Sequence, residues 1–332
     1  MSTIRDVAKA AGVSVATVSR VLNEPRLVRD STRRRVQEAI RDLNYRPSAT
    51  ARSLSLGRTM SISVAMPFVT RASFVERLRG IEATLSHHSC DLVVSNIESM
   101  VKRDSYYQSL LEGRQFDGVV LTTMRPRDEE AQVLADRPMP VVLLDTAHPL
   151  LSSVDSDDVE GGRMAARHLL ARGHRRIAFL GDNEFGFNFD SARERLDGFR
   201  EVLAQAGRAL SERDEWWIPY SSRAARELVP QILDRPPAER PTALFATSDM
   251  TALGVLDGLQ DAGLRAPDDL AVIGYDDLEM AGWHELTTIH QPLFQSGVWA
   301  IEMLLGQMES SAPRPEPVHL NLPLRLVPRA TT

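Results

Sequence analysis

Residues 3–23 constrain this chain more than any other segment, because they predict two short helices separated by a tight turn. The first helix is predicted from Ile4 to Ala11, and Gly12 follows at a position where helices commonly end with a positive φ angle. Ser14 is a good N-cap for a second helix that continues to Asn23. Two helices joined by a short turn that contains glycine form the helix-turn-helix layout, whose second helix enters the major groove of DNA.

Local patterns support both helices. Thr3 and Asp6 have the spacing of a capping box, with Asp in place of the usual Glu or Gln. In the second helix, Val18, Val21 and Leu22 lie at i, i+3 and i+4 and form one apolar face. A helical hairpin of a small bundle would show the same features, so these residues alone leave both interpretations open.

The charge distribution favours DNA binding. Residues 1–59 contain 12 Lys and Arg against five Asp and Glu, a net charge of +7, whereas the whole chain carries −6, so the remainder carries −13. A third helix is predicted from Ser31, as its N-cap, to Leu43, and it adds four arginines: Arg33, Arg34, Arg35 and Arg41. A basic head on an acidic body is expected where one end of a chain meets phosphate. A solvated basic face without a partner is the alternative.

Several motifs resemble the lactose/galactose repressor family of bacterial transcription regulators in order and spacing. They are Thr3-Ile4-Arg5-Asp6-Val7-Ala8, Gly12-Val13-Ser14, Thr17-Val18-Ser19-Arg20-Val21-Leu22-Asn23, Tyr45-Arg46-Pro47-Ser48-Ala49 and Ala51-Arg52-Ser53-Leu54. The resemblance implies an all-α helix-turn-helix head with a hinge helix, followed by a two-lobed α/β domain with parallel sheets, like periplasmic sugar-binding proteins. The implied boundaries are 1–46 for the head, 47–59 for the hinge helix and linker, and 60–332 for an effector-binding and dimerisation domain. Within that domain, the implied N-lobe is about 60–158 plus 292–322, and the implied C-lobe is about 159–290 plus 323–332.

The exposed face of the second helix is predicted to contact DNA. Arg20 can donate two hydrogen bonds to guanine, and Val15 and Ala16 can make shape contacts such as those with a thymine methyl group. By resemblance, these three positions are the base-reading ones of the family. Thr17, Ser19 and Tyr45 are expected to hold phosphates, which position the head without reading sequence. The predicted DNA-binding set also includes Ser14 and Asn23.

Pro47 to Leu54 is predicted to be a short helix, because proline is tolerated in a first turn and Gly57 follows its end. Such a helix is too short to be stable alone in water. By resemblance, paired hinge helices form on specific DNA, where Leu54 wedges a base step open in the minor groove and Ala51 occupies the close-packed position. Ser48 stands where many members have Asn. An ordinary linker is the alternative.

Other function classes find little support. The sequence has no apolar stretch long enough to span a membrane and no signal peptide, so a cytoplasmic protein is expected. Cys90 is the single cysteine, which excludes an intrachain disulfide and offers no metal cluster. There is no Gly-x-Ser-x-Gly, no P-loop and no His/Cys metal spacing, so we expect neither an enzyme nor a cofactor.

From Ser61 onward, short apolar runs alternate with amphipathic segments. The runs are Ser61–Met66, Asp91–Ser95, Gly118–Leu121, Val141–Leu144, Arg176–Leu180, Ala243–Ala246, Leu270–Gly274 and a single strand-like run at Leu320–Val327. The candidate helices are Ser73–His87, Lys102–Gly113, Val159–Arg172, Ser191–Ala206, Ala224–Leu233 and Met250–Ala262. This alternation predicts parallel sheets covered by helices on both faces, and two successive sets predict two similar lobes.

Ligands of such sheets bind beyond the carboxyl ends of the strands. Polar residues at those ends are Thr122, Asp145, Ser248 and Asp276, and Arg195 lies early in a predicted helix. An Asp and an Arg that each engage two neighbouring hydroxyl groups suit sugar recognition. Each residue also has a structural alternative, such as a turn-capping role for an Asp.

The resemblance adds roles to several of these positions. Gly274-Tyr275-Asp276-Asp277 matches a family signature whose first Asp binds the effector, and Arg195 matches the effector-binding arginine. Trp217 matches the aromatic residue that stacks on the effector, Gln291 matches a crossover residue that reaches the pocket, and Phe74 is a candidate wall residue. Ser248 departs from the Asn of several sugar-responsive members. Core packing is the alternative for Trp217.

Together these features predict a transcriptional repressor whose affinity for double-stranded operator DNA is controlled allosterically by a small metabolite, expected to be a sugar. By resemblance, the operator is expected to be a pseudo-palindrome with a central CG step. Longer members of the family form tetramers through a terminal helical zipper, and no heptad repeat follows the last strand here, so a homodimer is expected to bind it. The alternatives are a purine-type regulator that needs its ligand to bind DNA, and a solute-binding protein without a DNA role. The sequence leaves the effector, the operator and the sign of regulation open.

Overall fold

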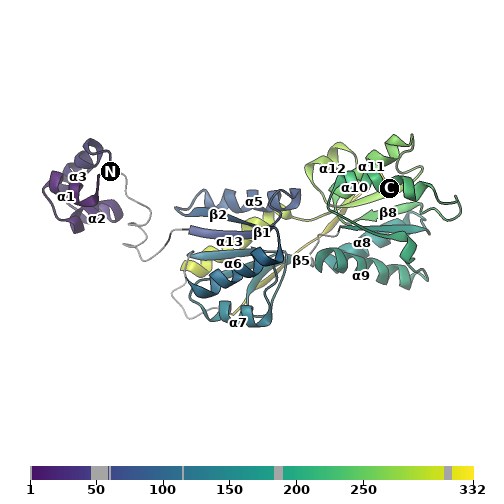
Figure 1. The fold of residues 1–332 in the computed structure, drawn as a ribbon, viewed down its shortest axis with the longest axis horizontal. Coiled ribbons are helices and arrows are strands. Elements are labelled where there is room, and N and C mark those ends of the chain that lie inside the picture. Colours follow the sequence, from purple (N-terminus) through teal and green to yellow (C-terminus); the bar gives the residue numbers. More distant parts are fainter. Residues whose placement is uncertain (1, 46–58, 60, 114–115, 183–189, 310–315) are drawn as a thin grey trace. The chain divides into compact units, whose positions relative to one another are not determined.

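The computed structural model describes residues 2–45, 59, 61–113, 116–182, 190–309 and 316–332. It divides the chain into two compact units, Met1–Met60 and Ser61–Thr332 (Figure 1). Within the described residues, no helix combines the length and the apolar character needed to cross a membrane.

The first unit contains the predicted helix-turn-helix. Its elements are α1 (Ile4–Ala11), α2 (Val15–Asn23), the 3-10 helix η1 (Pro25–Leu27) and α3 (Asp30–Asp42). Thr3 and Asp6 form the predicted capping box, and Gly12 ends α1 with a φ of 62°. Residues from all three α-helices share one small core: Val7, Ala8, Ala11, Val18, Val21, Val36, Ala39 and Tyr45.

The predicted N-cap of the third helix is wrong by two residues. Helix α3 begins at Asp30, and Arg29 is its N-cap without a side-chain hydrogen bond. Ser31 therefore lies inside the first turn and does not cap it. Asp30 explains the earlier start, because a carboxylate in the first turn is favoured by the helix dipole and Asp30 also pairs with Arg33 at 2.9 Å.

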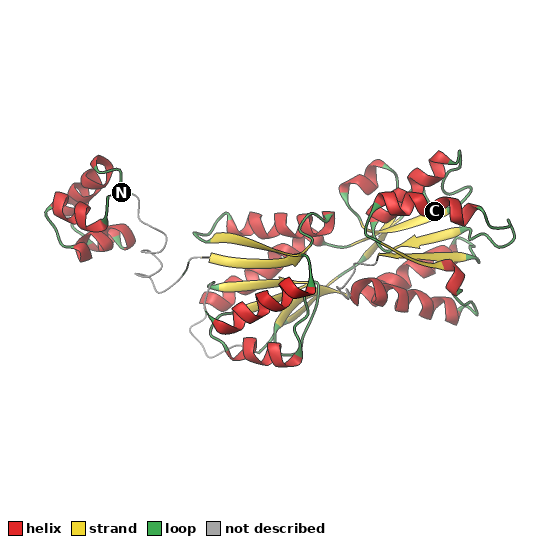
Figure 2. Ribbon diagram, in the orientation of Figure 1, coloured by secondary structure: helices red, strands yellow, loops and turns green. Residues whose placement is uncertain are grey.

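The second unit contains two six-stranded sheets, each flanked by helices on both faces (Figure 2). We call each sheet with its helices a lobe. The first lobe has the strand order β11-β5-β4-β3-β1-β2, with all neighbours parallel. Its strands are β1 (Ser61–Pro67), β2 (Asp91–Ile97), β3 (Gly118–Thr122), β4 (Val141–Leu144), β5 (Ser152–Ser156) and β11 (His319–Leu322). Its helices are α5 (Ala72–Leu85), α6 (Met100–Glu112), α7 (Asp128–Asp136) and α13 (Leu293–Glu309).

The second lobe has the strand order β12-β10-β9-β8-β6-β7, in which only β12 is antiparallel to its neighbour. Its strands are β6 (Ile177–Asp182), β7 (Glu215–Ile218), β8 (Ala243–Ala246), β9 (Ala271–Asp276), β10 (Thr287–His290) and β12 (Arg325–Val327). Its helices are α8 (Asp158–Ala171), α9 (Asp190–Gln205), η2 (Glu212–Asp214), α10 (Ser222–Leu233), α11 (Asp249–Asp261) and α12 (Glu279–Trp283).

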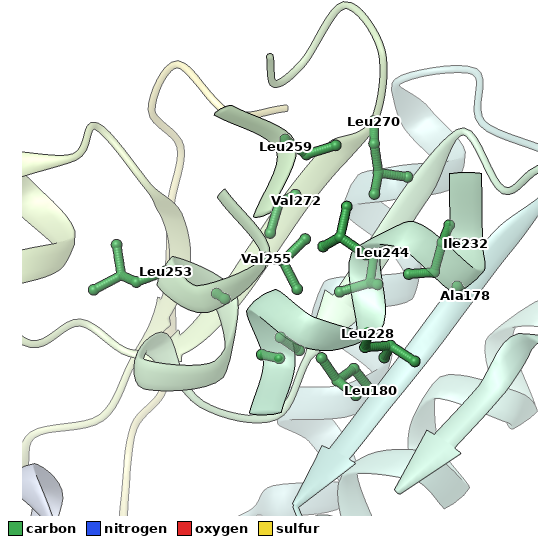
Figure 3. Packing of buried hydrophobic residues seen from close by; sticks show 14 of the residues in the cluster. Ala178, Leu180, Leu228, Ile232, Leu244, Leu253, Val255, Leu259, Leu270 and Val272 are labelled. Atoms are coloured by element: carbon green, nitrogen blue, oxygen red, sulfur yellow. The ribbon is translucent and has the colours of Figure 1, made fainter. Parts of the chain in front are cut away.

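Alternating side chains of the central strands build a core on each face of a sheet. In the second lobe, Leu180, Leu244 and Val272 pack against α10 and α11, as the close view in Figure 3 shows. Phe179, Phe245 and their neighbours on the opposite face pack against α8 and α9. Both faces are therefore buried, which explains why these strands read as continuous apolar runs in the sequence.

The chain passes between the lobes three times, after β5, after β10 and after β11. The last passage corrects the sequence prediction of one strand at Leu320–Val327. The run forms two short strands, β11 and β12, which belong to different sheets. Pro323 lies between them, and proline cannot donate a ladder hydrogen bond in the interior of a strand.

Candidate functional site

The exposed face of α2 is the candidate DNA interface in the first unit. Ser14 caps the helix by accepting from the backbone N–H of Thr17 at 3.1 Å. Val15 is 42% exposed, and Ala16 and Arg20 are also exposed, because the buried Val18 and Val21 turn the other face of the helix inward. An exposed surface with two small apolar side chains and one arginine can contact base edges in the major groove of DNA.

The other predicted DNA contacts have different environments. Thr17 and Ser19 are half-buried on α2, and Asn23 is its last residue. Tyr45 is only 8% exposed and packs in the core of the head, so its ring holds the three helices together. Ser48, Ala51 and Leu54 lie outside the described residues.

A cavity between the two lobes is the second candidate site, and we call it the interlobe cavity. The space between its walls is about 440 Å³ including the opening to solvent, and about 40 Å³ of it is open to the centre of a water molecule. Its walls come from the ends of strands and the starts of helices in both lobes. They are Arg71, Ser73, Phe74, Arg77, Thr123, Asp145, Asp182, Ser191, Arg195, Tyr220, Thr247, Ser248, Asp276 and Gln291.

On the first-lobe side, Arg77 of α5 forms a buried ion pair with Asp145, which follows β4. Arg77 also donates to the side-chain oxygen of Gln291 at 3.3 Å, and Gln291 in turn donates to Asp276 at 2.7 Å. Burial raises the pKa of Asp145 although Arg77 lies against it. Gln291 thus links the polar groups of the two lobes through the crossover that follows β10.

On the second-lobe side, Arg195 of α9 is held by three groups. Its Nε donates to Asp158 at 2.8 Å, its Nη1 donates to the carbonyl oxygen of Thr247 at 2.7 Å, and its guanidinium lies 3.7 Å from the centre of the Tyr275 ring. The Tyr275 hydroxyl donates to the same Asp158 oxygen at 2.9 Å. Burial alone would lower the pKa of Arg195, but Asp158 and other nearby oxygens raise it above its usual value. Arg195 is therefore a fixed, charged donor.

Asp276 is the acceptor that these groups leave available. It ends β9 with a φ of 114°, and its side chain is almost fully buried. Burial raises the pKa of Asp276 to about 7, although Arg195, Arg77 and the Gln291 amide each favour its charged form. A carboxylate kept so far from water needs polar partners, such as the hydroxyl groups of a ligand.

Some buried polar atoms of the lining residues have no hydrogen-bond partner among the described residues, among them the Nε of Arg77 and the hydroxyl of Tyr220. Burial and the nearby Asp276 raise the pKa of Tyr220, so its hydroxyl keeps its proton at neutral pH. Buried polar atoms are seldom left unpaired, so both are positions where a ligand or a water molecule could bind.

Six of the eight predicted effector residues line this cavity. They are Phe74, Asp145, Arg195, Ser248, Asp276 and Gln291. Thr122 does not, since it is fully buried as the last residue of β3, and the next residue, Thr123, lines the cavity in its place.

The structure corrects the prediction for Trp217, which is not among the lining residues. Its ring packs against Phe179 with centroids 5.8 Å apart, and its indole N–H donates to Glu215 at 2.8 Å. The aromatic residue that this lobe contributes to the cavity wall is Tyr220, three residues later. The physical reason is strand alternation, because Trp217 lies within β7 and its side chain points to the face that α8 and α9 cover.

Sequence reasoning missed four charged or aromatic wall residues: Arg71, Arg77, Asp182 and Tyr220. Asp182 ends β6, so the search for polar groups at strand ends could have found it. Arg71 and Arg77 belong to the segment after β1, in which the sequence pattern pointed only to Phe74. Tyr220 follows β7, a strand that the apolar pattern did not reveal.

Comparisons with known proteins cover both units. Residues 3–48 match the family of bacterial regulatory proteins known as the lacI family, and residues 166–332 match the periplasmic binding protein-like domain. The HTH-type transcriptional repressor PurR of Photobacterium profundum is 33% identical over 316 residues, which cover 93% of this chain and 92% of that protein.

Solved structures are similar over the whole chain. The Lac repressor dimer bound to operator and the anti-inducer ONPF matches with a TM-score of 0.84 and 29% identity, covering 99% of this chain and 98% of that one. The complex of the transcriptional regulator CelR with cellobiose matches with a TM-score of 0.70 and 29% identity, covering 100% of both chains.

Proposed function

Because the chain belongs to the lacI family and is therefore an effector-controlled, DNA-binding transcriptional regulator, we propose that a sugar in the interlobe cavity sets its affinity for operator DNA. We propose further that it does so as a homodimer in the cytoplasm and without catalysis. The family members it resembles are repressors, and one of them is a dimer on its operator.

The observation that carries the sugar proposal is the pairing of charges in the cavity. Each of its three arginines already has a carboxylate partner, since Arg71 pairs with Asp182, Arg77 with Asp145 and Arg195 with Asp158. Asp276 has no arginine hydrogen-bond partner among the described residues, and besides the Gln291 amide it can accept hydrogen bonds from a ligand. A neutral molecule with several hydroxyl groups fits this arrangement, because it offers donors to Asp276 and acceptors to the arginine N–H groups.

Two aromatic side chains, Phe74 and Tyr220, complete the walls of this cavity. Aromatic faces pack well against the apolar faces of sugar rings, and equally well against planar bases. The similarity to a regulator solved with cellobiose supports a sugar. The 33% identity to repressors named PurR favours a second candidate, a purine-type ligand that promotes DNA binding.

For DNA binding we propose that residues 1–46 form the reading head and residues 47–59 the hinge. Val15, Ala16 and Arg20 read bases. Thr17, Ser19 and Tyr45 position the head on phosphates, and Ala51 and Leu54 act in the minor groove. Ser14, Asn23 and Ser48 complete the proposed DNA-binding set. The exposed face of α2 supports the first set, since its apolar face is buried in the head. Residues 60–332 then hold the effector and the dimer contact.

Exposed apolar side chains support the dimer. Val93 and Val94 lie on the edge strand β2 and are each 38% exposed, and Val101 at the start of α6 is 80% exposed. A second copy of the chain would cover them, and paired heads would match a pseudo-palindromic operator.

Calorimetric titration of the full chain tests the effector proposal. The panel contains neutral mono- and disaccharides, their phosphate esters and purine bases. We expect a neutral sugar to bind and the same sugar to bind Asp276→Asn at least tenfold more weakly, because an amide accepts fewer hydrogen bonds. Binding of a purine base alone would support the second candidate, and binding of only a phosphate ester would contradict the charge argument.

A further inference from the structure

One ion pair joins the two lobes at the interlobe cavity. Arg71 precedes α5 of the first lobe, and its Nη1 donates to a carboxylate oxygen of Asp182, the last residue of β6 in the second lobe, at 3.1 Å. Both side chains are only 10% exposed. With so little water around the pair its two charges attract each other strongly, and removing either one would leave the other buried without its partner.

A third residue holds the same arginine. The Arg71 guanidinium lies 4.2 Å from the centre of the Tyr220 ring, and Tyr220 follows β7 in the second lobe. Arg71 thus contacts the second lobe through a carboxylate on β6 and through an aromatic face beyond β7. Arginine suits this position better than lysine, because its planar group can stack and donate at the same time.

The partner of Arg71 is itself held in place. Thr247 donates its hydroxyl proton to the second carboxylate oxygen of Asp182 at 2.9 Å, and it accepts from the backbone N–H of Asp182 at 3.2 Å. The carbonyl oxygen of Thr247 accepts from Arg195. A chain of hydrogen bonds therefore runs from Arg71 of the first lobe to the proposed effector-binding arginine of the second.

The side chain of Arg71 does not serve the helix that begins beside it. Arg71 is the N-cap residue of α5, where it makes no side-chain capping bond. A positive charge at a helix N-terminus is unfavourable, and Ser, Thr, Asp or Asn would serve better there. Phe68, which accepts the turn hydrogen bond from the Arg71 N–H, has a φ of 48°. A locally unfavourable choice beside a strained turn is typical of a functional position.

We propose that Arg71, Asp182 and Tyr220 form a latch that holds the two lobes closed over the cavity before any effector binds. The latch raises the fraction of chains in the closed, binding-competent form, and less of the effector's binding free energy is then needed to complete closure. The inference rests on the proposed function only in taking this cavity as the effector site, and it holds for a sugar or a purine alike.

Distances between two spin labels in the full-length chain without effector test the latch. The labels are placed at Glu82 of α5 and Gln231 of α10, exposed positions on helices that begin beside Arg71 and Tyr220, in a Cys90→Ser background. Labelled chains are diluted with unlabelled ones, so that only distances within one chain are measured. We expect one dominant short distance in the unsubstituted protein.

Removing either charge should release the lobes. In Arg71→Gln and in Asp182→Asn, we expect a second, longer distance to appear. The ratio of the population with the short distance to the population with the longer one should fall about fivefold or more. The exchanged pair, Arg71→Asp with Asp182→Arg, should recover part of the short-distance population. Arg79→Gln is the matched control, because Arg79 lies on the same helix and its ion-pair partner among the described residues is Glu76 of that helix.

Distance distributions in Arg71→Gln that equal those of the unsubstituted protein would overturn the latch. An exchanged pair no more closed than the single variants would overturn ion pairing as its cause. Arg71→Lys, which keeps the charge and loses the planar stack on Tyr220, provides a milder variant with an intermediate expected shift. Because these measurements contain no effector, their outcome is independent of whether a sugar binds.

Discussion

A β-carbon at Gly162 would lie 1.9 Å from the carbonyl oxygen of Arg195, so α8 and α9 touch through their backbones at the residue that reaches into the interlobe cavity. The contact is reciprocal, since a β-carbon at Gly198 of α9 would lie 1.8 Å from the carbonyl oxygen of Val159 in α8. This close approach lets Asp158, at the start of α8, hold the Arg195 side chain. The spacing Arg195-x-x-Gly198 thus has a packing reason.

Gly162→Ala should therefore weaken effector binding without touching the effector. The added methyl group forces α8 and α9 apart and moves Arg195 away from Asp158. We expect a loss of stability of about 1–3 kcal/mol, as for other overpacked sites, and a loss of effector affinity of about tenfold. Urea unfolding and calorimetry measure the two effects. Gly306→Ala in α13 is the control, because its β-carbon would meet nothing within 4 Å, and it should leave both quantities unchanged or slightly raise stability.

Arg195→Ala should abolish the effector response and spare operator binding, because Arg195 belongs to the interlobe cavity and the head is a separate unit. The buried Asp158 loses its cation in this variant, so we also expect a loss of stability of about 3 kcal/mol. Operator affinity with and without effector measures the first effect. A normal effector response in the folded variant would remove Arg195 from the proposed site.

The buried carboxylate of Asp276 predicts a pH dependence with a definite sign. Its pKa of about 7 in the folded chain lies above the value of an unfolded Asp, so the folded state binds the proton more tightly. Folding stability from this group is therefore present at low pH and is lost as pH rises from about 4 to about 7, by up to about 1.4 kcal/mol per pH unit. Asp276→Asn should flatten the pH dependence of the unfolding free energy in that window. An unchanged slope would contradict the raised pKa.

Effector affinity should change in the opposite direction. A charged carboxylate accepts hydrogen bonds from ligand hydroxyl groups better than a protonated one, so affinity should rise as pH increases through about 7. Asp155, whose pKa burial and the nearby Asp145 also raise to about 7, does not line the interlobe cavity but lies beside its residues Arg77, Asp145 and Gln291. Asp155→Asn therefore tests this second titrating group, and it should leave the pH dependence of effector affinity in place.

Arg20→Ala tests the reading face of α2. Loss of two hydrogen bonds to guanine should cost about 1–3 kcal/mol on a specific palindrome, and much less on a scrambled duplex. Fluorescence anisotropy with both duplexes at several salt concentrations measures this difference. Equal losses of affinity for the two duplexes would indicate that Arg20 contacts phosphate groups and does not read bases.

Much of the fold follows from strong local patterns in the chain. The capping box at Thr3 and Asp6 and the N-cap at Ser14 located the head helices, and the buried strands β3, β4 and β8 stand out as apolar runs. Pro323 can be seen in the sequence, but the sequence does not show which sheet the residues on either side of it join. That assignment depends on tertiary strand pairing, which local patterns do not specify.

The candidate site was predictable where it follows the ends of evident strands. Asp145 and Asp276 were found in that way, and both line the cavity. Thr122 and Trp217 failed because a shift of one residue in a strand reverses the direction of a side chain. Arg71 could not be found, because its role depends on Asp182, which is 111 residues away in the chain.

The central claim, a DNA-binding regulator whose operator affinity an effector sets, is tested most directly by anisotropy titrations on a palindrome with a central CG step. A scrambled duplex is the control, and each titration is repeated with the sugars and the purine bases. We predict a salt-sensitive preference for the palindrome and a binding midpoint that one ligand shifts in the unsubstituted protein. In Arg195→Ala the same ligand should leave the midpoint unchanged. A preference that no ligand alters would contradict the proposed effectors, and equal binding to both duplexes would contradict the assigned operator.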